Sequence, residues 1–207
     1  MEMTRIRAAL ILVAIVSTAS LARAEIIDRI LAVVDGAIIM QSDVVIAVRL
    51  AMVPASPAGD PIPPALDVLI ERRLILAEVD RYAPPDPPEA EVDRHLTEIR
   101  TRAGAKFDPA LVECGVSLEQ LRRQVRDDLR IESYLLQRFG SMQPSDEEIL
   151  AYYRDHQVAY TKNGVVLPLN DVREAVKAEI ITERRNATIR DWVAGLRRRA
   201  NVNVLPR

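Results

Sequence analysis

Two proline clusters divide this chain and restrict the elements that it can form. Pro54 to Pro64 contains five prolines in eleven residues, and Pro84 to Pro88 contains four in five. Proline lacks a backbone N–H and fixes φ, so neither stretch can continue a helix or a central strand. We therefore expect a stiff surface loop at the first cluster and a break between two helices at the second.

Before the first proline cluster, the sequence predicts a β-hairpin. Ile26 to Val34 and Ala37 to Met40 are apolar, largely β-branched runs joined by Asp35-Gly36, and both turn residues tolerate positive φ. Because the runs are apolar nearly throughout, we expect a small sheet that is covered on both faces. Gln41-Ser42-Asp43 is then expected to cap a helix from Val44 to Val53.

The rest of the chain is dominated by helical periodicity. Apolar stripes and end signals predict helices over 65–82, 89–103, 108–114, 118–139, 147–156 and 171–200. Two of these helices begin at capping boxes, in which Ser117 pairs with Gln120 and Ser145 with Glu148. Residues 160–168 are expected to be irregular, with Asn170 or Asp171 capping the last helix.

The last helix changes its apolar face along its length. Val172, Val176 and Ile180 share one side, whereas the later apolar residues lie well round the cylinder: Ile189, Trp192, Val193 and Leu196. Such a helix bends or packs against two different partners, and we assign Trp192 to the core. The alternating residues Val202 to Leu205 predict a terminal strand that returns to the hairpin. The expected fold is mainly α, closed by a small β-sheet.

The first 24 residues have the pattern of a secretory signal peptide. Arg5 and Arg7 precede the apolar run 8–16, which is too short to anchor a bilayer, and Ala22-Arg23-Ala24 is an A-x-A cleavage pattern. We expect cleavage after Ala24, export to the periplasm and no stable membrane insertion. The remaining chain would consist of an N-terminal helical part over 25–143 and C-terminal helices with a return strand over 144–207.

The sequence contains few of the residue patterns that support catalysis or the binding of metals, cofactors or nucleic acids. Residues 25–207 hold 25 basic and 29 acidic side chains, a net charge of about −4 without a clustered basic face for nucleic acid. His95 and His156 lie in polar helical contexts, and Cys114 has no second cysteine and is expected in the core. No nucleophile elbow, phosphate loop or glycine-rich dinucleotide turn occurs. We therefore expect no enzyme activity, no metal and no cofactor.

The order of segments resembles the SurA-type periplasmic chaperones. The resemblance rests on a signal peptide followed by Ile30 to Ile39 and Gln41 to Val44, then Leu66 to Glu78, the stretch from Gly115 to Leu129, Pro144 to Tyr153, and Val172 to Val204. It implies a helical chaperone core that binds unfolded polypeptides, above all outer-membrane proteins, without ATP. In that family, parvulin prolyl-isomerase domains separate the last two helices. Here only the fourteen residues Gln157 to Asn170 do so, and we expect no isomerase activity.

Candidate client contacts are large side chains near helix ends: Tyr82, Phe107, Phe139, Met142, Tyr152 and Tyr153. Exposed apolar faces bind other chains, but each of these residues could instead belong to the core. Two other functions stay open. One is an envelope adaptor that uses the same fold to bind a single partner, and the other is an envelope enzyme built from dispersed carboxylates. The sequence does not indicate an oligomeric state.

Overall fold

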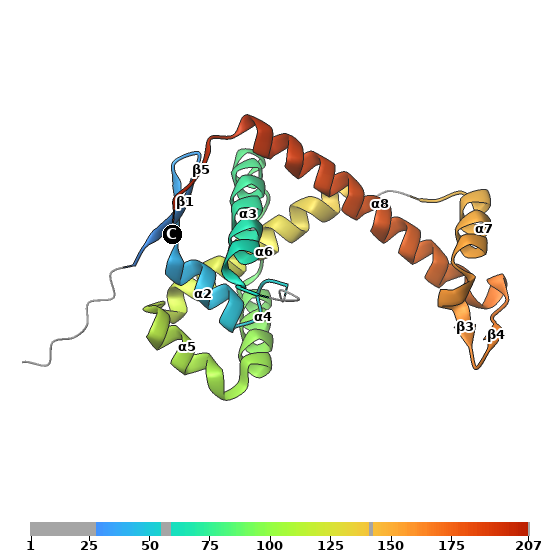
Figure 1. The fold of residues 1–207 in the computed structure, drawn as a ribbon, viewed down its shortest axis with the longest axis horizontal. Helices are drawn as coiled ribbons and strands as arrows, with labels where there is room; N and C mark the ends of the chain where they lie inside the picture. Colours follow the sequence, from blue (N-terminus) through green and yellow to red (C-terminus); the bar gives the residue numbers. More distant parts are fainter. Residues whose placement is uncertain (1–27, 55–58, 141–142, 207) are drawn as a thin grey trace, which may run out of the picture.

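The computed structural model describes residues 28–54, 59–140 and 143–206. The fold is mainly helical with a small antiparallel sheet, as the sequence predicts. Figure 1 shows a main body that contains the sheet and most helices, and a smaller distal lobe at the far end of the last helix. The predicted signal peptide and its cleavage site lie outside the described residues.

The sheet joins the two ends of the described chain. Strands β1 (Ile30–Val34) and β2 (Ala37–Met40) form the predicted hairpin, with positive φ at both Asp35 and Gly36. Strand β5 (Val202–Val204) pairs antiparallel with the other edge of β1, so that the strand order is β2-β1-β5. The prediction of a returning terminal strand is confirmed.

The helices of the main body correspond to those predicted from the sequence. They are α2 (Gln41–Arg49), α3 (Ile62–Tyr82), α4 (Glu89–Ala103), α5 (Phe107–Cys114) and α6 (Leu118–Phe139), with the short 3-10 turn η1 (Gly104–Lys106) before α5. Ser117 accepts the N–H of Gln120, and the Gln120 side chain accepts the N–H of Ser117. The capping box predicted for this helix is therefore confirmed.

Two predicted helix starts in the main body are wrong by three residues. Helix α2 begins at Gln41, because Asp43 accepts the N–H of Met40 from inside the first turn instead of preceding the helix. Helix α3 begins at Ile62, so Pro63 and Pro64 belong to its first turn rather than to the loop. The first turn tolerates proline because its N–H groups have no partner within the helix.

The distal lobe consists of α7 (Asp146–Asp155), the 3-10 turn η2 (Gln157–Tyr160), the strands β3 (Thr161–Lys162) and β4 (Val165–Val166), and the first part of α8 (Leu169–Arg199). Ser145 and Glu148 form the second predicted capping box. The prediction that 160–168 is irregular is wrong, because Asn163 and Gly164 turn a hairpin. Its strands are too short to show an alternating pattern.

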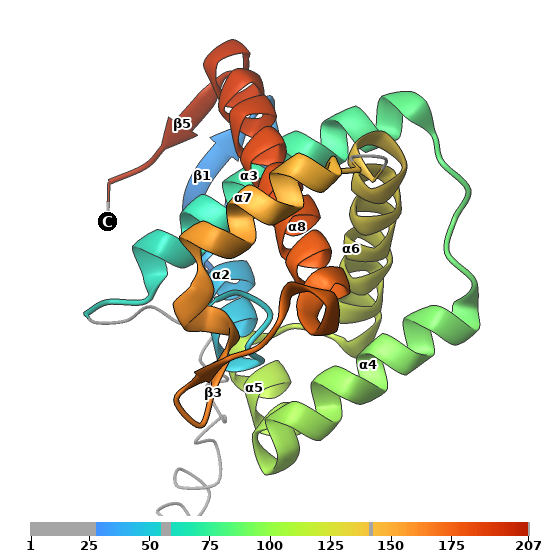
Figure 2. The same cartoon turned by 90° about the vertical axis from the view of Figure 1, so that its right-hand side faces the viewer.

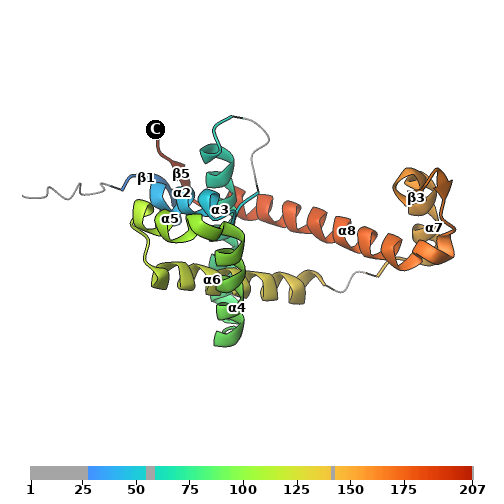
Figure 3. The ribbon, with the colours of Figure 1, turned by 90° about the horizontal axis from the view of Figure 1, so that it is seen from below.

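Helix α8 connects the two regions. It has 31 residues and begins directly after Pro168, so the predicted cap at Asn170 or Asp171 is wrong. Val176 and Ile180 are buried in the distal lobe, whereas Val193 and Leu196 are buried in the main body. The change of apolar face predicted from the sequence is therefore the change from one packing partner to the other. Figure 3 shows α8 as an arm with α7 and β3 at its end.

Candidate functional site

The distal lobe has a very small core. Its buried side chains are Ile149 from α7, Tyr160 from η2, and Val176 and Ile180 from α8. Figure 2 views this lobe from its outer side, where α7 crosses in front of α8 and the β3–β4 hairpin lies below them. The main body, by contrast, contains three clusters of buried apolar residues.

Polar contacts of three tyrosines supplement the small core. The Tyr152 hydroxyl donates to Glu183 at 2.8 Å, Tyr153 donates to the Leu167 carbonyl at 2.6 Å, and Tyr160 donates to Glu179. Burial and the Glu183 carboxylate raise the pKa of Tyr152 to about 12, and burial and Glu179 raise the pKa of Tyr160 further. The phenols of Tyr152 and Tyr160 therefore stay protonated at neutral pH and act as structural donors.

Apolar side chains are exposed on the surface of the same lobe. Val158 in η2 is 90% exposed and Val165 in β4 is 66% exposed, while Leu150 and Val166 are also exposed. We call these four residues the distal apolar surface. Single exposed apolar residues are common on soluble proteins, whereas four within one small lobe indicate a surface that can contact another chain.

A second group of large side chains lies where α3, α6 and α8 meet in the main body. The ring of Tyr134 is 5.4 Å from that of Tyr82 and 6.0 Å from that of Trp192, which is 5.5 Å from Phe139. The Arg138 guanidinium lies over three of these rings at 5.5 to 5.9 Å. Such cation–π contacts cover aromatic faces that would otherwise meet water.

The structure separates the six predicted client contacts. Tyr82 is 62% exposed and Phe139 is buried in the same aromatic group, while Tyr152 and Tyr153 are half-buried in the distal lobe. Phe107 is 2% exposed in a third place, the core between α2, α4 and α6, where it cannot reach a client. Met142 lies outside the described residues. Trp192, assigned to the core, is half-buried between two core clusters.

Sequence reasoning missed a polar pocket on the main body. The pocket has a volume of about 460 Å³ and lies between the start of α2, one face of α3, one face of α6 and the turn after α5. Its residues on α6 recur at helical spacing: Gln120, Arg123, Gln124, Asp127 and Asp128. This spacing was visible in the sequence, but the partner face on α3 could not be identified without the fold.

An ion pair between α3 and α6 lies in the wall of this pocket. Arg72 Nε is 2.9 Å from Asp128 Oδ1, and Arg72 also donates to the Met52 carbonyl at 3.4 Å. In the part of the chain that the structure describes, Arg72 Nη1 and Asp128 Oδ1 are buried without a hydrogen bond of good geometry. Burial raises the pKa of the Asp128 carboxyl to about 6, although Arg72 opposes that shift.

The two histidines and the cysteine contribute to local structure. His95 Nδ1 lies 3.1 Å from the Glu91 carbonyl, and the His156 ring stacks on Tyr152 at a centroid distance of 3.9 Å. Cys114 is buried, as predicted, and burial raises the pKa of its thiol. Within residues 28–54, 59–140 and 143–206, no three side chains of the metal-binding types come together. None of the described helices is long and apolar enough to span a membrane.

Comparisons with protein-family models and with curated proteins found no match to this chain.

Proposed function

We propose that the protein is a periplasmic chaperone that binds unfolded polypeptides, chiefly outer-membrane proteins, without ATP. The observation that supports this proposal best is the distal apolar surface, which α8 carries away from the main body. Apolar burial against such a surface is non-directional, so it can accept many sequences. A surface of only four apolar side chains also gives weak binding, which allows a client to leave again.

The arrangement of the two regions supports the same proposal. The distal lobe does not take part in the three-stranded sheet or in the three main-body clusters. Its exposed valines can therefore contact a client without disturbing the core that keeps the protein folded. The exposed Tyr82 of the aromatic group offers a second contact of the kind that binds polypeptides well, since aromatic rings combine apolar area with a polar group.

The test is suppression of aggregation by the purified protein. The triple variant Val158→Thr, Val165→Thr and Val166→Thr keeps the shape of each side chain and its β-branching, but makes three of the four side chains of the distal apolar surface polar. We expect the wild type to slow aggregation of an unfolded outer-membrane protein near equimolar ratio, and the triple variant to lose most of this effect. Light scattering gives the readout.

The matched control is Val112→Thr, which changes a valine that is 77% exposed on α5 of the main body. It should act like the wild type, with both variants showing the wild-type circular dichroism spectrum. If the triple variant protects the client as well as the wild type does, the distal apolar surface is not the binding site. Crosslinking in envelope extracts distinguishes a chaperone from an adaptor, because an adaptor would capture one partner.

We also propose that the protein lacks prolyl-isomerase activity. The connection between α7 and α8 holds only the η2 turn and the β3–β4 hairpin, which leaves no room for a parvulin domain. A proline-containing test peptide should isomerise at its uncatalysed rate in the presence of the protein. Acceleration that persists through purification would show that the domain argument is wrong.

A further inference from the structure

The polar pocket of the main body combines an apolar floor with charged walls. Its apolar lining comes from α2, α3 and the turn after α5, and includes Ile46, Leu69, Leu76 and Val116. At about 460 Å³, the pocket falls within the size range of small-ligand sites. A ligand that fits it must therefore carry an apolar part as well as a polar group.

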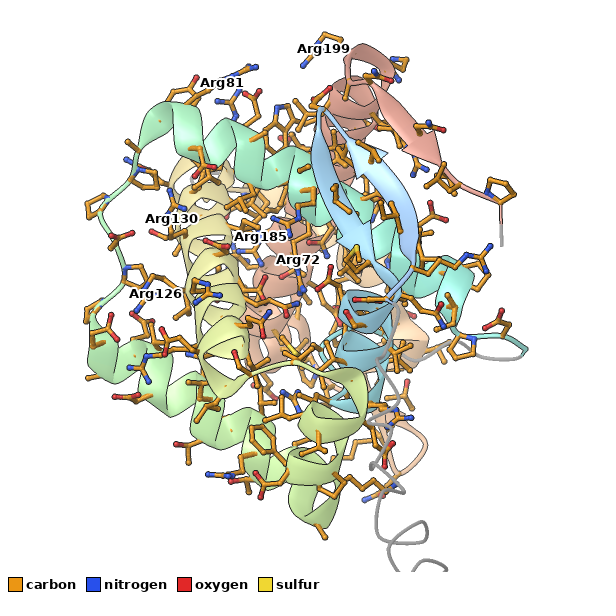
Figure 4. The ribbon with its side chains drawn as sticks, turned by 90° about the vertical axis from the view of Figure 1, so that its left-hand side faces the viewer. Arg72, Arg81, Arg126, Arg130, Arg185 and Arg199 are labelled. Atoms are coloured by element: carbon orange, nitrogen blue, oxygen red, sulfur yellow. The ribbon has the colours of Figure 1, made fainter. Side chains whose placement is uncertain are left out.

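Two arginines of the pocket differ in their ion pairing from the arginines on the neighbouring face of α6. On that face, Arg122, Arg126 and Arg130 pair with acidic residues of α3, α4 and the segment between them. Figure 4 shows Arg126 and Arg130 on this outer side, with Arg72 on the side of the sheet. Among the described residues, by contrast, Arg73 and Arg123 form no ion pair, although both line the pocket.

The acidic side chains of the pocket already have partners. Asp28 accepts hydrogen bonds from the backbone and the hydroxyl of Ser42, and Asp43 accepts the Met40 N–H at 2.9 Å. Asp128 pairs with Arg72, and Asp127 lies 3.5 Å from Arg130. The groups left to interact with a ligand are thus the guanidinium groups of Arg73 and Arg123, Arg72 Nη1 and the Gln124 amide, which makes no hydrogen bond within the described part of the chain. Arg73 also interacts electrostatically with Asp127, without forming an ion pair.

From this arrangement we propose that the pocket binds a monocarboxylate with an apolar substituent. The carboxylate pairs with Arg73 and Arg123, whose planar guanidinium groups match its two oxygens, and the Gln124 amide donates a further hydrogen bond. The apolar substituent packs on Ile46, Leu69 and Leu76. The four aspartates of the pocket repel any anion, so they disfavour a phosphate dianion, with its two charges, more than a carboxylate.

This chemistry has two sources, a free aliphatic acid or the terminal carboxylate of a peptide that ends in an apolar residue. Titration calorimetry with sodium octanoate, with the peptide acetyl-Ala-Ala-Val-Leu and with the C-terminal amide of that peptide distinguishes them. Binding of octanoate alone assigns the site to free acids. Binding of the peptide acid but not of its amide assigns it to chain ends.

The variant that tests the site is Arg73→Gln combined with Arg123→Gln. Both residues are exposed and neither forms an ion pair, and Arg73 interacts with Asp127 only at longer range, so their loss should change the melting temperature little. We expect at least a tenfold loss of affinity for whichever carboxylate binds. Arg154→Gln is the matched control, since Arg154 is an exposed arginine at the end of α7, outside the pocket. It should bind like the wild type.

Three outcomes would overturn the proposal. The first is that neither octanoate nor the peptide acid binds at millimolar concentration, and the second is that the double variant binds as well as the wild type. The third is that inorganic phosphate displaces the carboxylate at equal concentration, which would reduce the pocket to a general anion site. Because the pocket lies in the main body, each result is independent of the aggregation assay on the distal apolar surface.

Discussion

The main body and the distal lobe stabilise their folds in different ways. The main body buries apolar side chains from six helices, α2 to α6 and the end of α8, and from the hairpin strands β1 and β2 in three clusters. The distal lobe buries four residues and relies on tyrosine–glutamate hydrogen bonds and on ion pairs such as Arg184 with Glu148. A lobe with so small a core opens more readily than the body that carries it. This difference suits a lobe that contacts other chains.

The largest expected effect comes from removing one isoleucine from each core. Ile70→Ala should lower the free energy of unfolding of the main body by about 2–5 kcal/mol, because it opens a cavity at a fully buried site. Ile180→Ala should instead remove amide-exchange protection from α7 and the start of α8, leaving β1 and α3 protected. Urea unfolding and hydrogen exchange give the two readouts. If each variant lost exchange protection equally in the main body and in the distal lobe, the two regions would unfold as one unit.

A pH titration tests the comparison through Asp128, a half-buried residue of the main body whose carboxyl has a raised pKa. The pKa of Asp128 is about 6 in the folded state, raised from 3.8 by burial, so the folded protein binds more protons than the unfolded chain between these values. Stability should therefore rise as pH falls from 7 to 5, by about 1 kcal/mol for this group. Urea unfolding at several pH values measures the rise, and Asp128→Asn should abolish this part of it.

The two capping boxes allow the same substitution to be made once in each region, with a similar local loss of helix stability. Ser117→Ala at the start of α6 and Ser145→Ala at the start of α7 each remove one cap hydrogen bond, which typically costs about 1 kcal/mol. In Ser117→Ala, the urea midpoint of the whole main body should fall. In Ser145→Ala, only the exchange protection of the distal lobe should fall. A midpoint shift of the same size in both variants would contradict the separation of the regions.

The smallest effect should appear in the distal lobe in acid. The guanidinium of Arg184 and the backbone N–H of Ser145 hold the pKa of Glu148 at about 2, below its ordinary 4.5. The stabilisation from this group is fully present above pH 4.5 and is lost as the pH falls from 4.5 toward 2. Hydrogen exchange of α7 should therefore accelerate over this range. High salt should weaken the effect, since the pair is exposed to solvent.

Local signals were sufficient to predict most elements. Ser117 and Ser145 mark helix starts because a side-chain oxygen replaces the missing backbone partner, and Gly115 ends α5 with positive φ. The two apolar faces of α8 predicted its two packing partners. The β3–β4 hairpin was missed because two residues per strand carry no period, even though Asn163-Gly164 is a strong turn signal.

The candidate sites were harder to predict because they depend on the distances between elements. Tyr82 and Phe139 are 57 positions apart in the sequence, and only the packing of α3, α6 and α8 brings them into one aromatic group. The exposure of Val158 and Val165 depends on how little the distal lobe buries. Likewise, Arg72 and Asp128 become partners only when α3 lies against α6.

The pairing of β5 with β1 has a consequence for how the protein acquires its fold. Val34 pairs with Val202, so this contact closes a loop of nearly the whole described chain. Contacts at such a sequence separation form slowly, because the search for the partner strand is long. During synthesis, β1 and β2 must wait as a two-stranded hairpin until the last strand emerges, and such hairpins are marginally stable alone. The newly made chain thus passes through a stage in which the side of β1 that later pairs with β5 is open to pairing with other strands.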